Sequence, residues 1–433
     1  AVMLFNADAE LRRRALGERW VLSGEAVEIK GQYKYLGVEL LQHGSWKEYA
    51  KRAIQNAKWT SEDLAWLVRR DSGMRARTAC TLWRTLVRPK MEYAAELWGG
   101  ELSLTQVKEM EQIQTDFCRL LLGLQGVQRV ANDVLRAELG MERLQARWAK
   151  LRMGYWRRLQ VASPDRLLSH LNTIRKAHSE LEGSIAQGWM VGTRKMLEIH
   201  GLGQFWQYPG LVGRMSKEEW KRRVAEAVEE REDRGREKRF KEMSSKASRR
   251  YVRLKWWGEW PDEAAVFTGE SGRRGARVHE RYLDDHCKGA GRKLKMLCRA
   301  GCLPVLDRVG LEMEWPAALR MCALCGTEAE TVQHFVVACP AHQKHRDAMV
   351  RGVRRGVEGA QVLVESMSPS DQCDLFLGKS TGVAKLDDWI DTLFKRFARK
   401  AWAGRSKSAN AVQEVTGVEG ALWELGRWAR VAG

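Results

Sequence analysis

Short apolar runs separated by polar residues and glycines open the chain, and they predict strands. Residues 1–5 read as a buried strand, and residues 19–23 and 27–30 read as two short strands around a turn. Residues 32–40 predict the next strand. Gly37 within it indicates a bulge or a close approach of the backbone to another group.

From Ser45 onward the apolar residues recur at intervals of three and four, which predicts helices. The first is expected over residues 45–70, with Ser45 as the N-cap of a capping box and Glu48 reaching back to it. Trp59 and Trp66 supply apolar surface on this helix.

Further helices follow with recognisable boundaries. One is predicted over residues 74–87 and ends before Pro89, which can start the next helix. Ser103 and Gln106 form a second capping box, and Asn132 is expected to cap a short helix. The remaining helices are predicted at residues 132–139, 142–160, 216–240, 292–299, 341–353, 386–403 and 411–431. The helix at 216–240 has an open alternative, in which it continues to residue 257.

These elements predict a mainly α protein with a small N-terminal β-hairpin or sheet. Alternating Arg and Glu in the helix after Ser216 are typical of a solvated face with i,i+4 ion pairs, and residues 270–275 read as a linker. The expected segments are residues 1–44 with the strands, 45–160 as a helical domain, 161–290 as a charged helical connector, 291–345 around a cysteine–histidine motif, and 346–433 as a basic helical tail.

The strongest chemical signal is a cysteine–histidine motif with the spacing C-x2-C-x8-H-x4-C, formed by Cys322, Cys325, His334 and Cys339. Three thiolates and an imidazole are the ligand set of a closed, structural Zn²⁺ site. The short first gap suits a tight turn, in which Gly326 can adopt positive φ. We expect one zinc ion that holds the fold and performs no chemistry; ordinary buried cysteines are the alternative.

Neighbouring residues offer other ligands. His342 and His345 lie beyond Pro340, which begins a new helix, and are expected to face solvent or phosphate. A second metal site is an open alternative whose spacing matches no standard site; its residues would be His286, Cys287, Cys298 and Cys302.

The overall charge points to a polyanionic partner. The chain carries 74 Lys and Arg against 55 Asp and Glu, a net charge of +19, which favours nucleic acid. Six of the nine cysteines are scattered, which is typical of a reducing, intracellular compartment such as the nucleus or cytoplasm rather than of a secreted protein. No apolar run approaches the length of a membrane span, and we expect no membrane partner. The first residue is not Met, so we expect that the start of a longer protein is missing.

Three motifs resemble parts of one family. Residues 35–38, Tyr-Leu-Gly-Val, preceded by residues 2–6, are similar to the primer-grip hairpin that closes the palm of non-LTR (LINE-type) reverse transcriptases. Residues 82–89 and 92–98 resemble the start of the thumb in these proteins. Residues 322–340 resemble the C-terminal CCHC segment that many of them carry. Together, in the family's order, the three motifs are more specific than any one alone.

The resemblance implies a palm end at residues 1–44, a thumb at 45–160 and a family activity of RNA-directed DNA polymerase. Palm carboxylates perform that reaction with two Mg²⁺ ions. In the family they lie N-terminal to the strand that opens this chain, so we expect no catalytic residue here and Mg²⁺ only in the parent palm. The expected partners are RNA and DNA, as template–primer and target, and the N-terminal palm and fingers of the parent polyprotein.

The resemblance also implies residues that contact nucleic acid. Phosphate contacts position a duplex without reading its sequence. The primer grip would use Lys34, Tyr35 and Gly37. The thumb would use Lys47, Lys51, Arg52 and Lys58, of which the three lysines fall near one helix face, and then Arg84 and Arg88. For each of these, a merely solvated face is the alternative.

Three acidic motifs do not support catalysis. The Tyr-Leu-Asp-Asp run at residues 282–285 matches a polymerase catalytic turn, but its flanks are polar and basic and it follows the primer-grip match, which reverses the family order. Some relatives carry a nuclease after the zinc segment. Here Asp262 precedes that segment and Asp371 lies at the start of a helix, so neither supports a nuclease.

A second hypothesis is a non-catalytic, zinc-stabilised helical scaffold with protein partners, as a decayed copy of such an element would give. The sequence upstream of residue 1 separates the two hypotheses, since an intact palm in frame favours the first.

Overall fold

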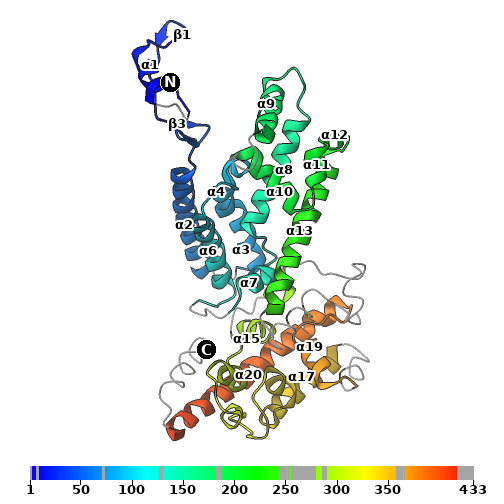
Figure 1. Ribbon diagram of the computed structural model, residues 1–433. Helices are drawn as coiled ribbons and strands as arrows, with labels where there is room; N and C mark the ends of the chain where they lie inside the picture. Colours follow the sequence, from blue (N-terminus) through cyan, green and yellow to red (C-terminus); the bar gives the residue numbers. More distant parts are fainter. Residues whose placement is uncertain are drawn as a thin grey trace. The chain divides into compact units, whose positions relative to one another are not determined.

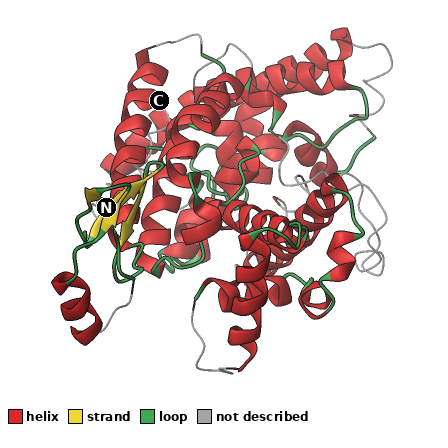
Figure 2. Cartoon of the chain, turned by 90° about the horizontal axis from the view of Figure 1, so that it is seen from above, coloured by secondary structure: helices red, strands yellow, loops and turns green. Residues whose placement is uncertain are grey.

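A computed structural model describes residues 2–5, 9–70, 74–125, 130–181, 188–242, 251, 254, 279–284, 290–356, 364 and 366–416. Over these residues the chain is mostly helical, with two small antiparallel hairpins near its N-terminus (Figures 1 and 2). This confirms the predicted fold class. No helix in this part of the chain is both long and apolar enough to cross a lipid bilayer. The linker predicted at residues 270–275 lies outside the described residues.

The chain forms two compact units, each assembled from separate stretches of sequence. The first contains residues 1–66, 81–114 and 142–234, and the second contains residues 67–80, 115–141 and 235–433. The division into five consecutive segments stays a prediction.

The strands near the N-terminus form two separate hairpins. They are β1 (Val21–Leu22), β2 (Glu25–Ala26), β3 (Gln32–Tyr35) and β4 (Val38–Leu41), after the helix α1 (Ala9–Gly17). β1 pairs with β2, and β3 pairs with β4 so that Lys34 lies opposite Glu39. The single strand predicted over residues 32–40 is wrong, because Leu36 and Gly37, at φ 48° and 81°, reverse the chain there.

The buried strand predicted at residues 1–5 is also wrong. Val2 makes one isolated parallel bridge with Ile29, and Phe5 is 52% exposed. An apolar run needs strands or helices on both sides to be buried, and two-stranded hairpins present no such layer.

Helix α2 (Lys47–Arg70) agrees with the predicted boundaries. The hydroxyl of Ser45 accepts a hydrogen bond from the Lys47 amide at 3.3 Å. Glu48, however, binds the Lys51 ammonium at 2.9 Å, where the capping box predicted a bond to the backbone. The buried side of α2 consists of Tyr49, Ala50, Ala53, Ile54, Ala57 and Leu64.

The helical path continues through Pro89, where a break was predicted. α3 (Ala76–Leu82) passes through a π-helical turn (Trp83–Val87) into α4 (Arg88–Glu92), with Pro89 in its first turn. A proline ring clashes with the carbonyl four residues before it in a regular helix. The wider turn ahead of Pro89 relieves this clash, so the helix need not end.

Side-chain caps set several helix starts. Ser103 and Gln106 exchange hydrogen bonds of 3.3 and 3.2 Å at the start of α6 (Leu104–Leu121), which confirms that capping box. Ser216 accepts from the Glu219 amide at 3.1 Å and starts α13 (Lys217–Glu242), also as predicted. Asn132 does not cap α7 (Asn132–Leu139); that position belongs to Ala131, and the Asn132 amide oxygen accepts from Arg119.

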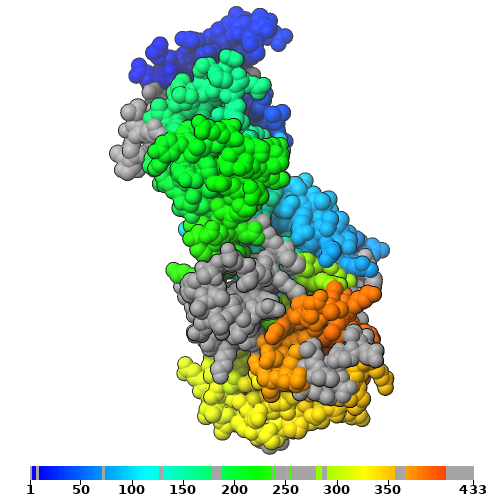
Figure 3. Space-filling model, turned by 90° about the vertical axis from the view of Figure 1, so that its right-hand side faces the viewer, coloured from blue at the N-terminus to red at the C-terminus, as the bar shows by residue number. Residues whose placement is uncertain are grey.

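Tryptophans dominate the core of the first unit. α8 (Leu144–Gln160) places Trp156 against Trp206 and Trp220, with ring centroids 6.2 and 5.8 Å apart. The helices around α8 are α5 (Ala95–Trp98), α9 (Leu167–Leu181), α10 (Trp189–Ile199), α11 (Gly203–Gln207) and α12 (Gly210–Gly213). In Figure 3 the surfaces of α9 and of α10 to α13 adjoin each other.

One long helix, α20 (Ala384–Thr416), organises the second unit. α15 (Ala290–Arg299) and α17 (Gln343–Gly356) pack against it. Figure 3 shows the orange surface of the helices near the C-terminus beside the yellow surface around α17. The interruption predicted after residue 403 is wrong, since the helix continues to Thr416. The shorter helices of this unit are α16 (Leu306–Glu312) and α19 (Pro369–Phe376).

Candidate metal centre and basic surface

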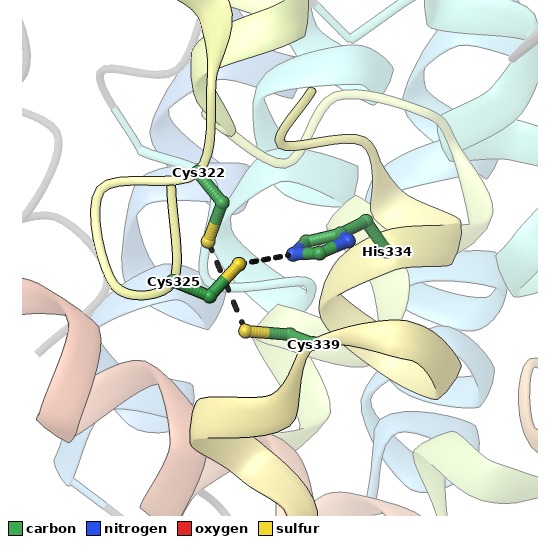
Figure 4. Close-up of side chains that lie close together, drawn as sticks. All are labelled: Cys322, Cys325, His334 and Cys339. Atoms are coloured by element: carbon green, nitrogen blue, oxygen red, sulfur yellow. Dashed lines mark hydrogen bonds between the residues drawn. The ribbon is translucent and has the colours of Figure 1, made fainter. Parts of the chain in front are cut away.

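Four side chains of the second unit converge: Cys322, Cys325, His334 and Cys339 (Figure 4). Their potential ligand atoms all lie within 4.8 Å of one another. The Cys322 and Cys339 sulfurs are 3.8 Å apart, and the Cys325 sulfur is 3.3 Å from His334 Nε2. Thiolates bound to a tetrahedral zinc at about 2.3 Å lie roughly 3.8 Å from each other. The cluster can therefore hold a metal ion with little rearrangement.

A tight turn places the first two cysteines. The Gly326 amide donates to the Cys322 carbonyl at 2.8 Å, and Gly326 has φ 66°, the positive value predicted for it. The Cys322 amide in turn donates to the Glu328 carbonyl at 2.8 Å. The backbone thus fixes both thiols on the same side of the turn.

A π-helical turn (His334–Ala338) places the other two ligands. In a regular α-helix, side chains five positions apart point about 140° away from each other. Here the Cys339 amide donates to the His334 carbonyl at 2.7 Å, the i to i+5 bond of a π-helix. This wider turn brings His334 and Cys339 near one face of the turn.

Glu328 orients the histidine and was not predicted. Its carboxylate lies 3.1 Å from His334 Nδ1, which leaves Nε2 for the cluster. The Thr331 hydroxyl accepts from the His334 amide at 3.0 Å. A carboxylate behind a ligating histidine is a frequent feature of metal sites. In the sequence, Glu328 is an ordinary acidic residue between two ligands, so only the geometry identifies it.

Two buried arginines attach the cluster to the helices around it. Arg405 of α20 binds both oxygens of Glu330, at 2.5 and 2.7 Å, and Glu330 is 1% exposed. Arg346 of α17 donates to the Val336 and Cys339 carbonyls at 3.1 and 2.7 Å. The metal-binding segment is therefore joined to the core of the second unit by charged hydrogen bonds.

The three thiols differ in acidity. Burial raises the pKa of Cys322 to about 12, and it also raises the pKa of Cys339. For Cys325, burial acts in the same direction, but hydrogen bonds from Thr327, Cys322 and His334 outweigh it and lower the pKa to about 6. At neutral pH the metal-free cluster thus holds one thiolate and two thiols.

Metal binding is expected to release protons. Because metal ligands must be deprotonated, an ion that binds at pH 7 should displace about two protons, from Cys322 and Cys339. The apparent affinity should then rise by about 100-fold per pH unit around neutrality. Calorimetric titration of the metal-free chain in buffers of different ionisation enthalpy measures this number. An affinity independent of pH between about 6 and 8 would contradict the assigned protonation states.

His342 differs from the prediction. It is 3% exposed and packs between Phe335 and Phe397, with ring centroids 5.1 and 6.4 Å away, so it does not face solvent or phosphate. Burial, with Arg346 close by, lowers the pKa of His342 to about 4, which keeps the ring neutral. His345 is half-buried.

The alternative second metal site gains no support from the described residues. Cys298 is buried, Cys302 donates to the Ala300 carbonyl at 3.4 Å, and the one group of ligands found in this part of the chain is the Cys322 cluster. His286 and Cys287 lie outside the described residues.

Within the run at residues 282–285, the structure describes Tyr282 to Asp284, which make contacts inside the second unit. Tyr282 lies in a 3-10 turn (Arg281–Leu283), is 3% exposed and donates to Glu138 at 2.5 Å. Burial, and then the charge of Glu138, raise the pKa of the Tyr282 phenol well above its usual value. Asp284 accepts from the Arg77 amide at 3.0 Å and contacts His279 at 2.9 Å. Asp285 lies outside the described residues.

The other two acidic motifs remain without support for a nuclease. Ser368 accepts from the Asp371 amide at 3.2 Å and caps α19, so Asp371 lies at a helix start, as predicted. Asp262 lies outside the described residues.

The predicted lysines of α2 form an exposed row. Lys47, Lys51 and Lys58 are all exposed, and at about 100° per residue they lie within roughly 40° of one another around the helix axis. Lys51 is paired with Glu48 at 2.9 Å. Lys47 and Lys51 also line a hollow of 1160 Å³ inside the first unit, which Tyr155 and Trp189 border as well. We call Lys47, Lys51 and Lys58 the lysine row.

The arginines predicted to contact nucleic acid differ from one another in exposure and in ion pairing. Arg52 is exposed but pairs with Glu39, and Arg88 is half-buried and 3.5 Å from Glu92. Burial lowers the pKa of Arg88, although Glu92 acts in the opposite direction. Arg84 is half-buried. Their contacts with nucleic acid stay predictions.

The predicted primer-grip residues lie on the second hairpin. Lys34 is exposed, and Tyr35 is 59% exposed. Gly37 forms the turn, beside Tyr93, whose hydroxyl donates to the Leu36 carbonyl at 2.5 Å. The hairpin and the residue after α4 are thus in direct contact within the first unit.

Fold and site define a mainly α protein with a Cys3His cluster that can hold a metal ion. Comparisons with protein-family models, with curated proteins and with solved structures each found no match.

Proposed function

We propose that this chain is a nucleic-acid-binding region similar to the C-terminal part of a LINE-type reverse transcriptase. The lysine row carries the proposal, because three exposed ammonium groups follow one face of the helix that the resemblance assigns to the thumb. The net charge of +19 supports it. Phosphates of a template–primer duplex, or of target DNA or RNA, are the ligands that such a row fits.

The proposed metal is zinc, in a structural role. Thiolates are soft donors and suit Zn²⁺ better than Mg²⁺ or Ca²⁺. Cys322, Cys325, His334 and Cys339 would hold it, and a complete set of four ligands leaves no position for a reacting water. The zinc-bound segment would offer a further surface to RNA or target DNA.

The proposal assigns no catalytic residue to this chain. The family reaction, RNA-directed DNA synthesis, requires palm carboxylates and Mg²⁺, which would belong to the N-terminal palm and fingers of the parent protein. This chain would hold the duplex while that part extends it.

Direct binding tests the proposal. Fluorescence anisotropy with labelled duplex DNA and an RNA–DNA hybrid, at salt from about 50 to 200 mM, should show an affinity that falls by about 40-fold if three phosphates are neutralised on B-DNA. Absence of binding to either duplex at the lowest salt would refute it.

A zinc-stabilised scaffold with protein partners is the second candidate, and one observation favours it. Helix α9 exposes Leu167, Leu171 and Ile174, at 72%, 44% and 63%, and these residues share one helix face. Exposed apolar stripes of this kind often mark protein contacts. In-frame sequence upstream of residue 1 distinguishes the candidates, since a palm with an apolar-flanked Asp-Asp turn supports the polymerase.

A further inference from the structure

Two tryptophans of α2 have unusually exposed indoles. Trp59 is 58% exposed and Trp66 is 57% exposed, whereas no other tryptophan in the described part of the chain exceeds 36%. Trp83, Trp98, Trp148, Trp156 and Trp220, in contrast, are completely buried. Two large, exposed aromatic side chains on one helix mark a candidate binding surface.

The two rings form a row beside the lysine row. Trp59 and Trp66 are seven positions apart, so they lie about 10 Å apart along the axis and within roughly 20° of each other around it. The lysine row lies about 90° away around the helix. One helix therefore presents a line of indoles and, on the adjacent side, a line of ammonium groups.

The charges of the helix favour an anionic ligand. α2 carries six basic residues, Lys47, Lys51, Arg52, Lys58, Arg69 and Arg70, against three acidic ones, Glu48, Glu62 and Asp63. Glu48 is already paired with Lys51. Glu62, exposed and positioned between the two rows, is the acidic residue that such a ligand would meet first.

We infer that this face of α2 binds unpaired nucleotides, with bases stacked on Trp59 and Trp66 and phosphates on the lysine row. A duplex hides the faces of its bases within the stack, whereas a single strand exposes both bases and phosphates along its length. The inference rests on the proposed function and specifies its ligand: the single-stranded part of a template or target next to the duplex.

The test compares single-stranded and duplex ligands. Labelled oligothymidylate and duplex DNA are titrated with the full chain and with Trp59→Ala, Trp66→Ala and the double variant. Each replacement should weaken oligothymidylate binding by about 10-fold, with duplex binding little changed. Because stacking releases no counterions, the salt slope should stay the same. Trp59→Phe should retain most of the affinity, and Glu62→Gln should increase it.

Other outcomes separate the explanations. If the chain binds both ligands with a steep salt dependence and the double variant is unchanged, the stacking inference fails and the proposed function stands. If the chain binds neither ligand, both fail. If the double variant changes the sedimentation behaviour of the chain but not its binding, the indoles are a protein-docking face. Thermal unfolding of each variant shows whether a loss of binding reflects a loss of folding.

Discussion

Replacing Lys47, Lys51 and Lys58 together by alanine is expected to weaken binding to duplex DNA by on the order of 100-fold at about 100 mM salt. Each neutralised phosphate releases condensed counterions, with a slope of about −0.9 in a log–log plot. Removing three contacts should flatten that slope by up to about 2.7. Anisotropy titrations at several salt concentrations measure both quantities.

A matched control separates position from net charge. Lys195, Lys217 and Lys221 are also exposed lysines of the first unit, on α10 and α13 rather than on α2. Their triple replacement by alanine lowers the net charge equally and should leave the slope nearly unchanged. Equal effects of the two triple variants would mean that charge acts without a defined site, and the lysine row would be only a solvated face.

Loss of the metal is expected to loosen residues of about 315–345 while the first unit stays folded. The metal-binding segment has few large apolar residues of its own, so metal binding should supply much of its local folding free energy. Cys322→Ser with Cys339→Ser, or a chelator, should reduce amide protection there by on the order of 100-fold or more. Helices α6 and α8 should keep their protection. Hydrogen exchange followed by mass spectrometry reports both regions in one experiment.

Cys302→Ser is the control for this prediction. It removes a half-buried thiol of the same unit that is not part of the cluster. In this variant the amides of residues of about 315–345 should stay protected from exchange in zinc-free buffer, as in the unaltered chain. If Cys302→Ser and the cluster variant loosen the same amides equally, the effect is general destabilisation rather than metal loss.

Much of this structure could be predicted from local signals in the sequence. The capping residues Ser103, Gln106 and Ser216 act through bonds to their own backbone, so the printed residues suffice to predict them. The metal cluster was predictable for a similar reason, because its ligands lie within one short segment and their spacing reflects a local turn. The α2 lysine row follows from helical periodicity alone.

Features that depend on distant parts of the chain were not predictable. His342 and Glu330 are buried because Phe397 and Arg405 of α20 come to them, and nothing near either residue indicates this. The π-helical turns before Pro89 and at His334 have no distinct residue pattern, since both keep the apolar spacing of an ordinary helix. At Gly37 the sequence predicted a bulge or a close approach of the backbone; the structure has a chain reversal there, with the Tyr93 ring next to the glycine.

The most direct test of the zinc site is the metal content of the full chain. The chain is purified without added metal, its metal content is determined by elemental analysis, and hydrogen exchange is measured on the same sample. The account predicts one Zn²⁺ per chain, none in the Cys322→Ser, Cys339→Ser variant, and one in Cys302→Ser. A metal-free chain in which the amides of residues 322–339 are still protected would contradict it, and the three cysteines and His334 would then be ordinary core residues.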